Sequence, residues 1–159
     1  MSEPVRVLFV CLGNICRSPL AEIIVRHAAR QRQLDGRYHF ASAGTGDWHV
    51  GKGADPRSAA TAEQHGLDLS PHRARQITAR GISGWDWFVA MDRENRRNLL
   101  AMGVPASRVL LMRQFEAGDI TADVPDPYYG GPDGFEQAYA MLSANAEDLL
   151  DYLEEVAAS

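Results

Sequence analysis

The stretch that decides the fold of this chain is Cys11-Leu12-Gly13-Asn14-Ile15-Cys16-Arg17-Ser18. Residues 5–10, which precede it, are mostly apolar and rich in β-branched side chains, which predicts a buried strand. Pro19, which follows it, suits the first position of a helix, with Ser18 as the N-cap. Apolar residues then recur on one helical face to about Gln33. We therefore expect a loop that joins the carboxyl end of a strand to the amino end of a helix.

A loop in this position is suited to binding an anion. Its backbone N–H groups and the positive end of the helix dipole converge on one point. Arg17 adds a guanidinium group that can hold two oxygens in a bidentate fork. The same field should favour the thiolate of Cys11 at neutral pH, and Ser18 can donate a hydrogen bond to that sulfur. The loop therefore predicts transfer of a phosphoryl group to Cys11.

Length and composition limit the class of protein. The 159 residues, 45% of them hydrophobic and 23% charged, predict one globular domain over residues 1–159. A formal net charge of −5 argues against a nucleic-acid partner, and the lack of a long apolar run argues against a membrane. The two cysteines share one loop, so they do not indicate a secreted disulfide framework. With no basic-then-apolar leader at the N-terminus, we expect a cytoplasmic location.

The rest of the chain alternates between strands and helices. Further strands are expected at 38–41, within 85–91 and at 108–112. Asp55 and Asp92 are interpreted as N-caps of two helices, and a final amphipathic helix should begin at Gly134. This order predicts an α/β domain with four parallel strands, helices on both faces and the phosphate-binding loop after the first strand. A supporting catalytic role for Asp92 is the weaker alternative.

A second motif is the loop Val124-Pro125-Asp126-Pro127-Tyr128-Tyr129-Gly130-Gly131-Pro132. Its prolines and glycines exclude a helix or a strand, and composition alone would favour a connector with surface tyrosines. Phosphoryl transfer from oxygen to sulfur, however, needs a proton donor at the leaving group. Asp126, held between two prolines beside aromatic rings, is suited to that task. We interpret it as the general acid, which later acts as the base that activates water.

Both motifs resemble those of the low-molecular-weight protein tyrosine phosphatases. The string from Val10 to Pro19 and the later Asp-Pro-Tyr-Tyr-Gly match that family residue by residue. The resemblance implies hydrolysis of protein phosphotyrosine through a phosphocysteine, without a metal or other cofactor. It implies that Cys11, Arg17 and Asp126 are catalytic. The residues implied to bind substrate are Leu12, Gly13, Asn14, Ile15, Cys16, Ser18, Trp48, Tyr128 and Tyr129.

The same resemblance implies two supports for the phosphate loop. A hydroxyl at Ser42 could hold Asn14 in the left-handed conformation that turns the loop N–H groups inward. His72 would hydrogen-bond to Asn14 from another side. Without the resemblance, the segment after Ser42 would be interpreted as a plain turn. Trp48 would then be explained equally well as a side chain that anchors its own loop.

Three other functions are weighed against this one. Arsenate reductases on the same scaffold need further cysteines downstream, and this chain has only Cys11 and Cys16. Phosphoarginine phosphatases of related type look to carry a threonine where this loop has Ile15, which instead favours a flat aryl ring. A non-catalytic phosphate-binding module would not need both Cys11 and Asp126. The partners expected are phosphotyrosine-containing proteins, small aryl phosphates, and phosphate or similar oxyanions.

Cys16 suggests a further role in redox protection. It is close enough along the loop to form a reversible disulfide with Cys11, which would shield the reactive thiol from irreversible oxidation. The alternative is a buried thiol that only packs.

Overall fold

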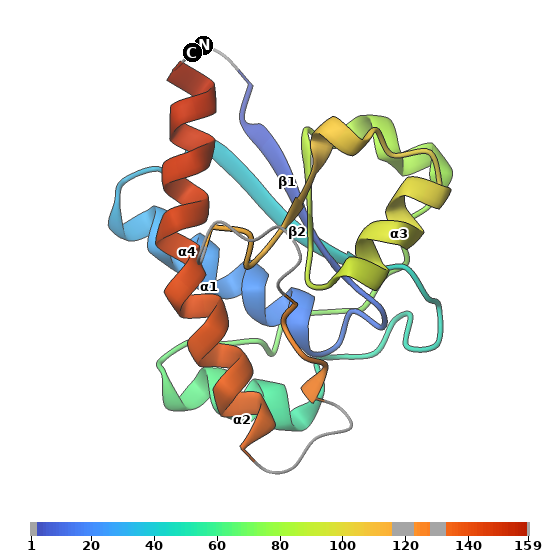
Figure 1. Cartoon of the computed structure of the whole chain (residues 1–159). Coiled ribbons are helices and arrows are strands. Elements are labelled where there is room, and N and C mark those ends of the chain that lie inside the picture. Colours follow the sequence, from blue (N-terminus) through green and yellow to red (C-terminus); the bar gives the residue numbers. More distant parts are fainter. Residues whose placement is uncertain (1–2, 116–122, 128–132, 159) are drawn as a thin grey trace.

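The computed structural model describes residues 3–115, 123–127 and 133–158. Strands and helices alternate along it (Figure 1). The strands are β1 (Val5–Cys11), β2 (Tyr38–Gly44), β3 (Trp87–Ala90) and β4 (Val109–Leu111). The α-helices are α1 (Arg17–Gln31), α2 (Pro56–Gln64), α3 (Arg93–Ala101) and α4 (Gly134–Ala158). Two short 3₁₀ helices are η1 (Ala79–Gly84) and η2 (Ala106–Arg108).

The strands form one parallel sheet in the order β2-β1-β3-β4. β1 pairs with β2 from Val5 to Cys11, and with β3 from Val7 to Val10. The predicted α/β fold with four parallel strands is confirmed. Because parallel strands end at the same edge of a sheet, Cys11 emerges at the carboxyl edge between the ends of β2 and β3, where α/β proteins bind ligands.

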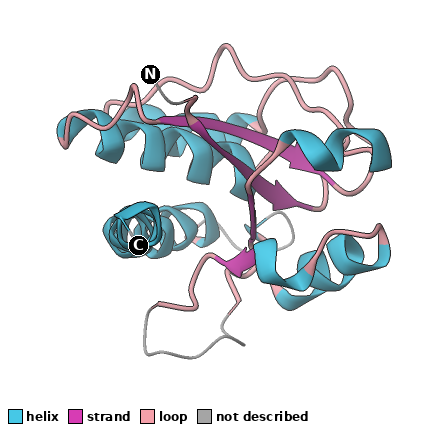
Figure 2. Ribbon diagram, turned by 90° about the horizontal axis from the view of Figure 1, so that it is seen from above, coloured by secondary structure: helices cyan, strands magenta, loops and turns pink. Residues whose placement is uncertain are grey.

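Helices cover both faces of this sheet, as predicted. On one face, α1 and α4 share a core with Val7 and Phe9 of β1. On the other face, Leu8 and Val10 pack with Leu99 of α3. Figure 2 shows the strands lying between these helices. Alternate side chains of β1 enter two separate cores, which explains its nearly continuous apolar sequence. No helix within the described ranges is both long and apolar enough to cross a membrane.

The start of α1 corrects one prediction. The helix begins at Arg17, and its N-cap is Cys16, which makes no side-chain capping bond. Ser18 is therefore not the N-cap: it lies in the first turn, fully buried, with its hydroxyl 3.0 Å from the sulfur of Cys11. The physical reason is that the loop closes tightly enough for Cys16 to accept the first backbone bond, from the N–H of Leu20. This closure leaves the Ser18 side chain facing the loop.

β2 also runs further than predicted, to Gly44. The N–H of Gly44 donates to Arg75 and its carbonyl accepts from Ile77, so a distant segment pairs with the end of the strand. A Cβ on Gly44 would lie 2.7 Å from the carbonyl oxygen of Leu12, which shows why glycine is needed where the strand meets the phosphate loop.

Candidate active site

The phosphate loop forms the floor of a cavity of about 300 Å³. In Figure 1 the orange segment 123–127 lies beside the blue turn between β1 and α1, and this proximity closes one side of the cavity. The structure thus brings together residues from three separate parts of the chain. The cavity is lined by Cys11, Leu12, Gly13, Ile15, Cys16, Arg17, Trp48, His49 and Asp126.

The sulfur of Cys11 is held at the bottom of this cavity by two hydrogen-bonding groups. Its Sγ lies 3.0 Å from Ser18 Oγ and accepts from the backbone N–H of Asn14 at 3.3 Å. Asn14 Nδ2 also donates to Ser18 Oγ at 2.9 Å, so that oxygen already serves as an acceptor. The hydroxyl proton of Ser18 is therefore free to point at the sulfur, and two donors stabilise a thiolate there.

Asn14 is the centre of the loop. It is fully buried with φ of 57°, the left-handed conformation expected from the sequence. Its Nδ2 donates to Ser42 Oγ at 3.0 Å, and its Oδ1 accepts from the backbone N–H of Arg75 at 2.9 Å. Its carbonyl lies 2.7 Å from Nε2 of His72. Because a carbonyl can only accept, His72 must be protonated at Nε2.

Ser42 and His72 thus lie where the sequence placed them, both in contact with Asn14. Burial lowers the pKa of His72, whereas its hydrogen bond to Asn14 acts in the opposite direction. The two side chains reach the loop from β2 and from the segment after α2, so the left-handed turn is fixed from two sides.

Arg17 extends the loop towards the acid segment. Its side chain is 3% exposed, and Nη1 donates to Asp92 Oδ2 at 2.7 Å and to the carbonyl of Val124 at 2.9 Å. Burial alone would lower its pKa, but the Cys11 sulfur and Asp92 outweigh burial and raise it. The buried Nε–H has no partner among the described residues. Nε is therefore available to an anion, and Nη2, on the same edge of the guanidinium group, lies 3.7 Å from Asp126 Oδ2.

Asp92 makes a second contact beyond the predicted helix cap. Its Oδ1 caps α3 by accepting from the N–H of Asn95 at 2.7 Å, as predicted. Its Oδ2 simultaneously holds Arg17. The signal that could have indicated this second contact is the position of Asp92 at the carboxyl edge of the sheet, next to β1.

Asp126 reaches the cavity from the far end of the chain. Its Oδ2 lies 3.7 Å from Nη2 of Arg17, and its side chain is 31% exposed. A carboxyl group here can reach both a leaving group and water entering the cavity. Tyr128 and Tyr129, the aromatic residues expected beside it, lie outside the described residues.

Ile15 and Cys16 support the loop from its other side. They pack with Ala74 and Phe135 in a small apolar cluster. Burial raises the pKa of the Cys16 thiol, and the nearby Asp55 raises it further, so Cys16 stays protonated at neutral pH. Both thiols of the chain are free. Cys11 and Cys16 therefore occupy different environments within one loop.

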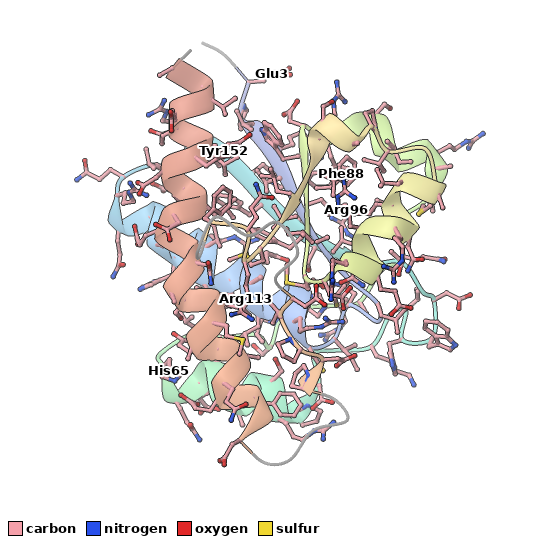
Figure 3. All side chains as sticks on the ribbon, in the orientation of Figure 1. Glu3, His65, Phe88, Arg96, Arg113 and Tyr152 are labelled. Carbon is pink, nitrogen blue, oxygen red and sulfur yellow. The ribbon has the colours of Figure 1, made fainter. Side chains whose placement is uncertain are left out.

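The amino end of α2 donates hydrogen bonds to two backbone carbonyls of the same loop. The N–H of Asp55 donates to the carbonyl of Ile15 at 2.9 Å, and the hydroxyl of Ser58 donates to that of Cys16 at 3.2 Å. α2 is in turn fixed to α4, because His65 stacks on Tyr139 with ring centroids 3.8 Å apart. Figure 3 labels His65 at this junction.

Trp48 and His49 form the outer wall of the cavity. Trp48 is 65% exposed, and its ring covers Gly46 so closely that a Cβ there would lie 1.9 Å from it. His49, which was not predicted from the sequence, packs over Gly13, where an added Cβ would lie 3.0 Å from its ring. Its position next to Trp48 is the only sequence signal that could have indicated it.

Leu12 and Gly13 complete the inner wall. A cysteine sulfur under backbone and hydroxyl donors, a buried arginine and a carboxylic acid at the rim together define a cysteine-dependent phosphohydrolase.

Comparison with known proteins agrees with this class. A family model described as low molecular weight phosphotyrosine protein phosphatase matches residues 6–159. The low molecular weight protein-tyrosine phosphatase A of Mycobacterium tuberculosis is 42% identical over 157 residues, which are 98% of this chain and 95% of that protein. The chain belongs to the family of low molecular weight phosphotyrosine protein phosphatases.

Solved structures give the same result. The crystal structure of YfkJ from Bacillus subtilis has a TM-score of 0.89 at 34% identity and covers 97% of each chain. Wzb of Vibrio vulnificus, solved in complex with benzylphosphonate, has a TM-score of 0.82 at 26% identity and covers 93% of this chain and 98% of that chain. Neither an arsenate reductase nor a phosphoarginine phosphatase is favoured by these matches.

Proposed function

We propose that this chain hydrolyses phosphotyrosine in proteins, and small aryl phosphates, by way of a phosphocysteine on Cys11. One observation carries the proposal: a single cavity is lined by the sulfur of Cys11, the guanidinium of Arg17 and the carboxyl group of Asp126. A nucleophile, an anion clamp and a proton donor are the groups that phosphoryl transfer to sulfur requires.

In the first step the thiolate of Cys11 attacks phosphorus in line with the bond to the tyrosine oxygen. The S–P bond forms, the P–O bond breaks, and Asp126 gives its proton to the departing phenolate oxygen. Arg17 and the loop amides bind the equatorial phosphoryl oxygens, whose charge must be stabilised throughout. Nη1 of Arg17 donates to the carboxylate of Asp92 and to the carbonyl of Val124, and these two bonds orient the remaining N–H groups towards the phosphoryl group.

In the second step Asp126, now ionised, takes a proton from water as the water oxygen attacks phosphorus. The S–P bond breaks and inorganic phosphate leaves. The hydroxyl of Ser18, 3.0 Å from the sulfur, donates to Cys11 as it recovers its negative charge. Ser18 thereby makes the thiolate a better leaving group.

Substrate choice follows from the walls of the cavity. Leu12, Ile15 and Trp48 line the cavity with apolar side chains. We expect backbone N–H groups of residues 12–18 to serve as oxyanion donors. An aryl ring fills such a slot, whereas the short side chain of phosphoserine does not bring its phosphate to Cys11. Benzylphosphonate binding by the related Wzb supports an aryl ligand in this chain as well. Tyr128 and Tyr129 are assigned to the same slot on family resemblance alone.

The proposal also covers the partners and the location of the protein. We expect protein and small-molecule partners that carry aryl phosphates or similar oxyanions, no nucleic-acid or membrane partner, and a cytoplasmic location. Cys16 is proposed as the thiol that converts an oxidised Cys11 into a disulfide. Its location in the same loop, as a free thiol, supports that role.

A substrate panel tests the proposed function. Peptides that carry phosphotyrosine, phosphoserine or phosphoarginine, together with arsenate plus thiol, are each assayed with and without a chelator. Phosphotyrosine should be preferred over phosphoserine by at least about a hundredfold in kcat/KM, because only the aryl ring fills the slot. The chelator should have no effect, and Cys11→Ser should abolish turnover. Activity in Cys11→Ser, or loss of activity with the chelator, would contradict the mechanism.

A further inference from the structure

The segment that carries Asp126 is attached to the rest of the molecule just before that residue. Asp123 Oδ1 accepts from the backbone N–H of Arg93, the first residue of α3, at 3.0 Å. Asp92 Oδ1 accepts from the N–H of Asn95 in the same turn. The amino end of α3 therefore binds two carboxylates, one that holds Arg17 and one from the acid segment.

The backbone of the same segment is fixed at two consecutive residues. The carbonyl of Asp123 accepts from Nη1 of Arg113 at 2.7 Å. The N–H of Val124 donates to the carbonyl of Met91 at 2.8 Å, and the Val124 carbonyl accepts from Arg17. Arg113, labelled in Figure 3, lies two residues after the end of β4, so residues beyond β3 and β4 and the phosphate loop all meet at this point.

Asp126 lies two residues after Val124 in this segment. Val124 is fully buried, and the Asp126 side chain is 31% exposed, with its carboxylate 3.7 Å from Nη2 of Arg17. Because the backbone is fixed at 123–124, the point from which the Asp126 side chain projects depends on those two residues. The attachment at Asp123 is the first fixed point of that segment among the described residues.

We propose that Asp123 and Arg113 are positioning residues for the general acid. They dock the acid segment on α3 and on the end of β4, so that Asp126 is presented to the leaving group above Cys11. The bond from the Arg93 N–H to Asp123 matters more than the ion pair between their side chains. Arg93 is 56% exposed and Asp123 35%, and an ion pair so open to water contributes little. The inference rests on the proposed function.

Leaving-group dependence tests the proposal, because an acid is needed only when the leaving group is a poor one. In Asp123→Ala, kcat/KM for a phosphotyrosine peptide should fall about tenfold, a fraction of what a general acid supplies. In the same variant kcat/KM for 2,4-dinitrophenyl phosphate should stay within about twofold, since that phenolate leaves without a proton. Asp123→Asn keeps an oxygen acceptor for the Arg93 N–H and should recover most of the lost activity. Arg113→Ala should repeat the selective loss.

Asp148→Ala, an exposed aspartate of α4, is the matched control and should behave as wild type on both substrates. Thermal unfolding of each variant checks that it is folded. An equal loss on both substrates in a folded Asp123→Ala, or no loss on either, would overturn the positioning role. A wild-type chain that does not hydrolyse phosphotyrosine would instead contradict the proposed function, so the two failures are distinguishable.

Discussion

The phosphate loop and the acid segment meet in one cavity but are built in different ways. In residues 11–18 the key side chains are almost wholly buried, with Asn14 and Ser18 at 0% exposure, and supports arrive from β2, α2 and the segment 72–75. In residues 123–127 the backbone is held at Asp123 and Val124, Pro127 is buried, and the Asp126 side chain between them is 31% exposed. The key side chains of the first region are enclosed, whereas the acid stands at the rim of the cavity.

This difference matches what each region has to do. Stabilising the charge on a phosphoryl group requires donors that are already in place and do not reorganise during the reaction. A general acid needs only to come within hydrogen-bond reach of the leaving oxygen, and it must also admit water in the second step. A half-exposed carboxyl group at the rim satisfies both conditions, whereas a half-exposed nucleophile loop would not.

Removing the acid should produce the largest selective effect. Asp126→Asn keeps the shape of the side chain but has no proton to give, so kcat/KM for a phosphotyrosine peptide should fall by about 10²–10⁴. Steady-state kinetics on the peptide measure this fall. A variant that keeps the wild-type kcat/KM would show that another group is the acid.

Breaking the brace of the phosphate loop should produce a smaller effect on rate but a larger one on stability. Asn14→Ala removes the donor to Ser18 and Ser42 and the acceptor for Arg75, and it strains a left-handed residue. We expect kcat to fall by up to about 10²-fold from misplacement of the sulfur. The free energy of unfolding should fall by about 2–4 kcal/mol, as buried partners are left unpaired.

Asn14→Gly separates the two causes, since glycine adopts the left-handed conformation without strain but lacks the amide. It should regain about 1–2 kcal/mol of stability relative to Asn14→Ala. Its kcat should remain low. If Asn14→Gly restored full activity, the amide network would not be what positions Cys11.

Much of this architecture could be predicted from the sequence because its signals are local. The strand, the loop and the helix around Cys11 are consecutive, and so are the stiff residues around Asp126. Asp55 and Asp92 cap helices that start one residue later, and the structure confirms both caps. The supports Ser42 and His72 are distant in sequence and came from family resemblance, not from pattern.

What could not be predicted depends on contacts between distant segments. The extension of β2 to Gly44 needs the backbone of residues 75–77 as a partner. The second contact of Asp92, the packing of His49 on Gly13 and the docking of Asp123 on α3 all arise where separate strands end together. Ser18 was predicted both to cap α1 and to contact the Cys11 sulfur, and the structure shows the contact but not the cap.

The central claim is that the braced loop carries covalent chemistry at Cys11 and the acid segment serves proton transfer. Asp126→Asn mixed with 2,4-dinitrophenyl phosphate tests it directly, because bond cleavage then needs no acid while hydrolysis of the intermediate lacks its base. Rapid denaturation, intact-mass measurement and peptide mapping should find one phosphoryl group per chain, on Cys11. Release of dinitrophenolate with no phosphoryl group on the protein, or with one on another residue, would contradict the account.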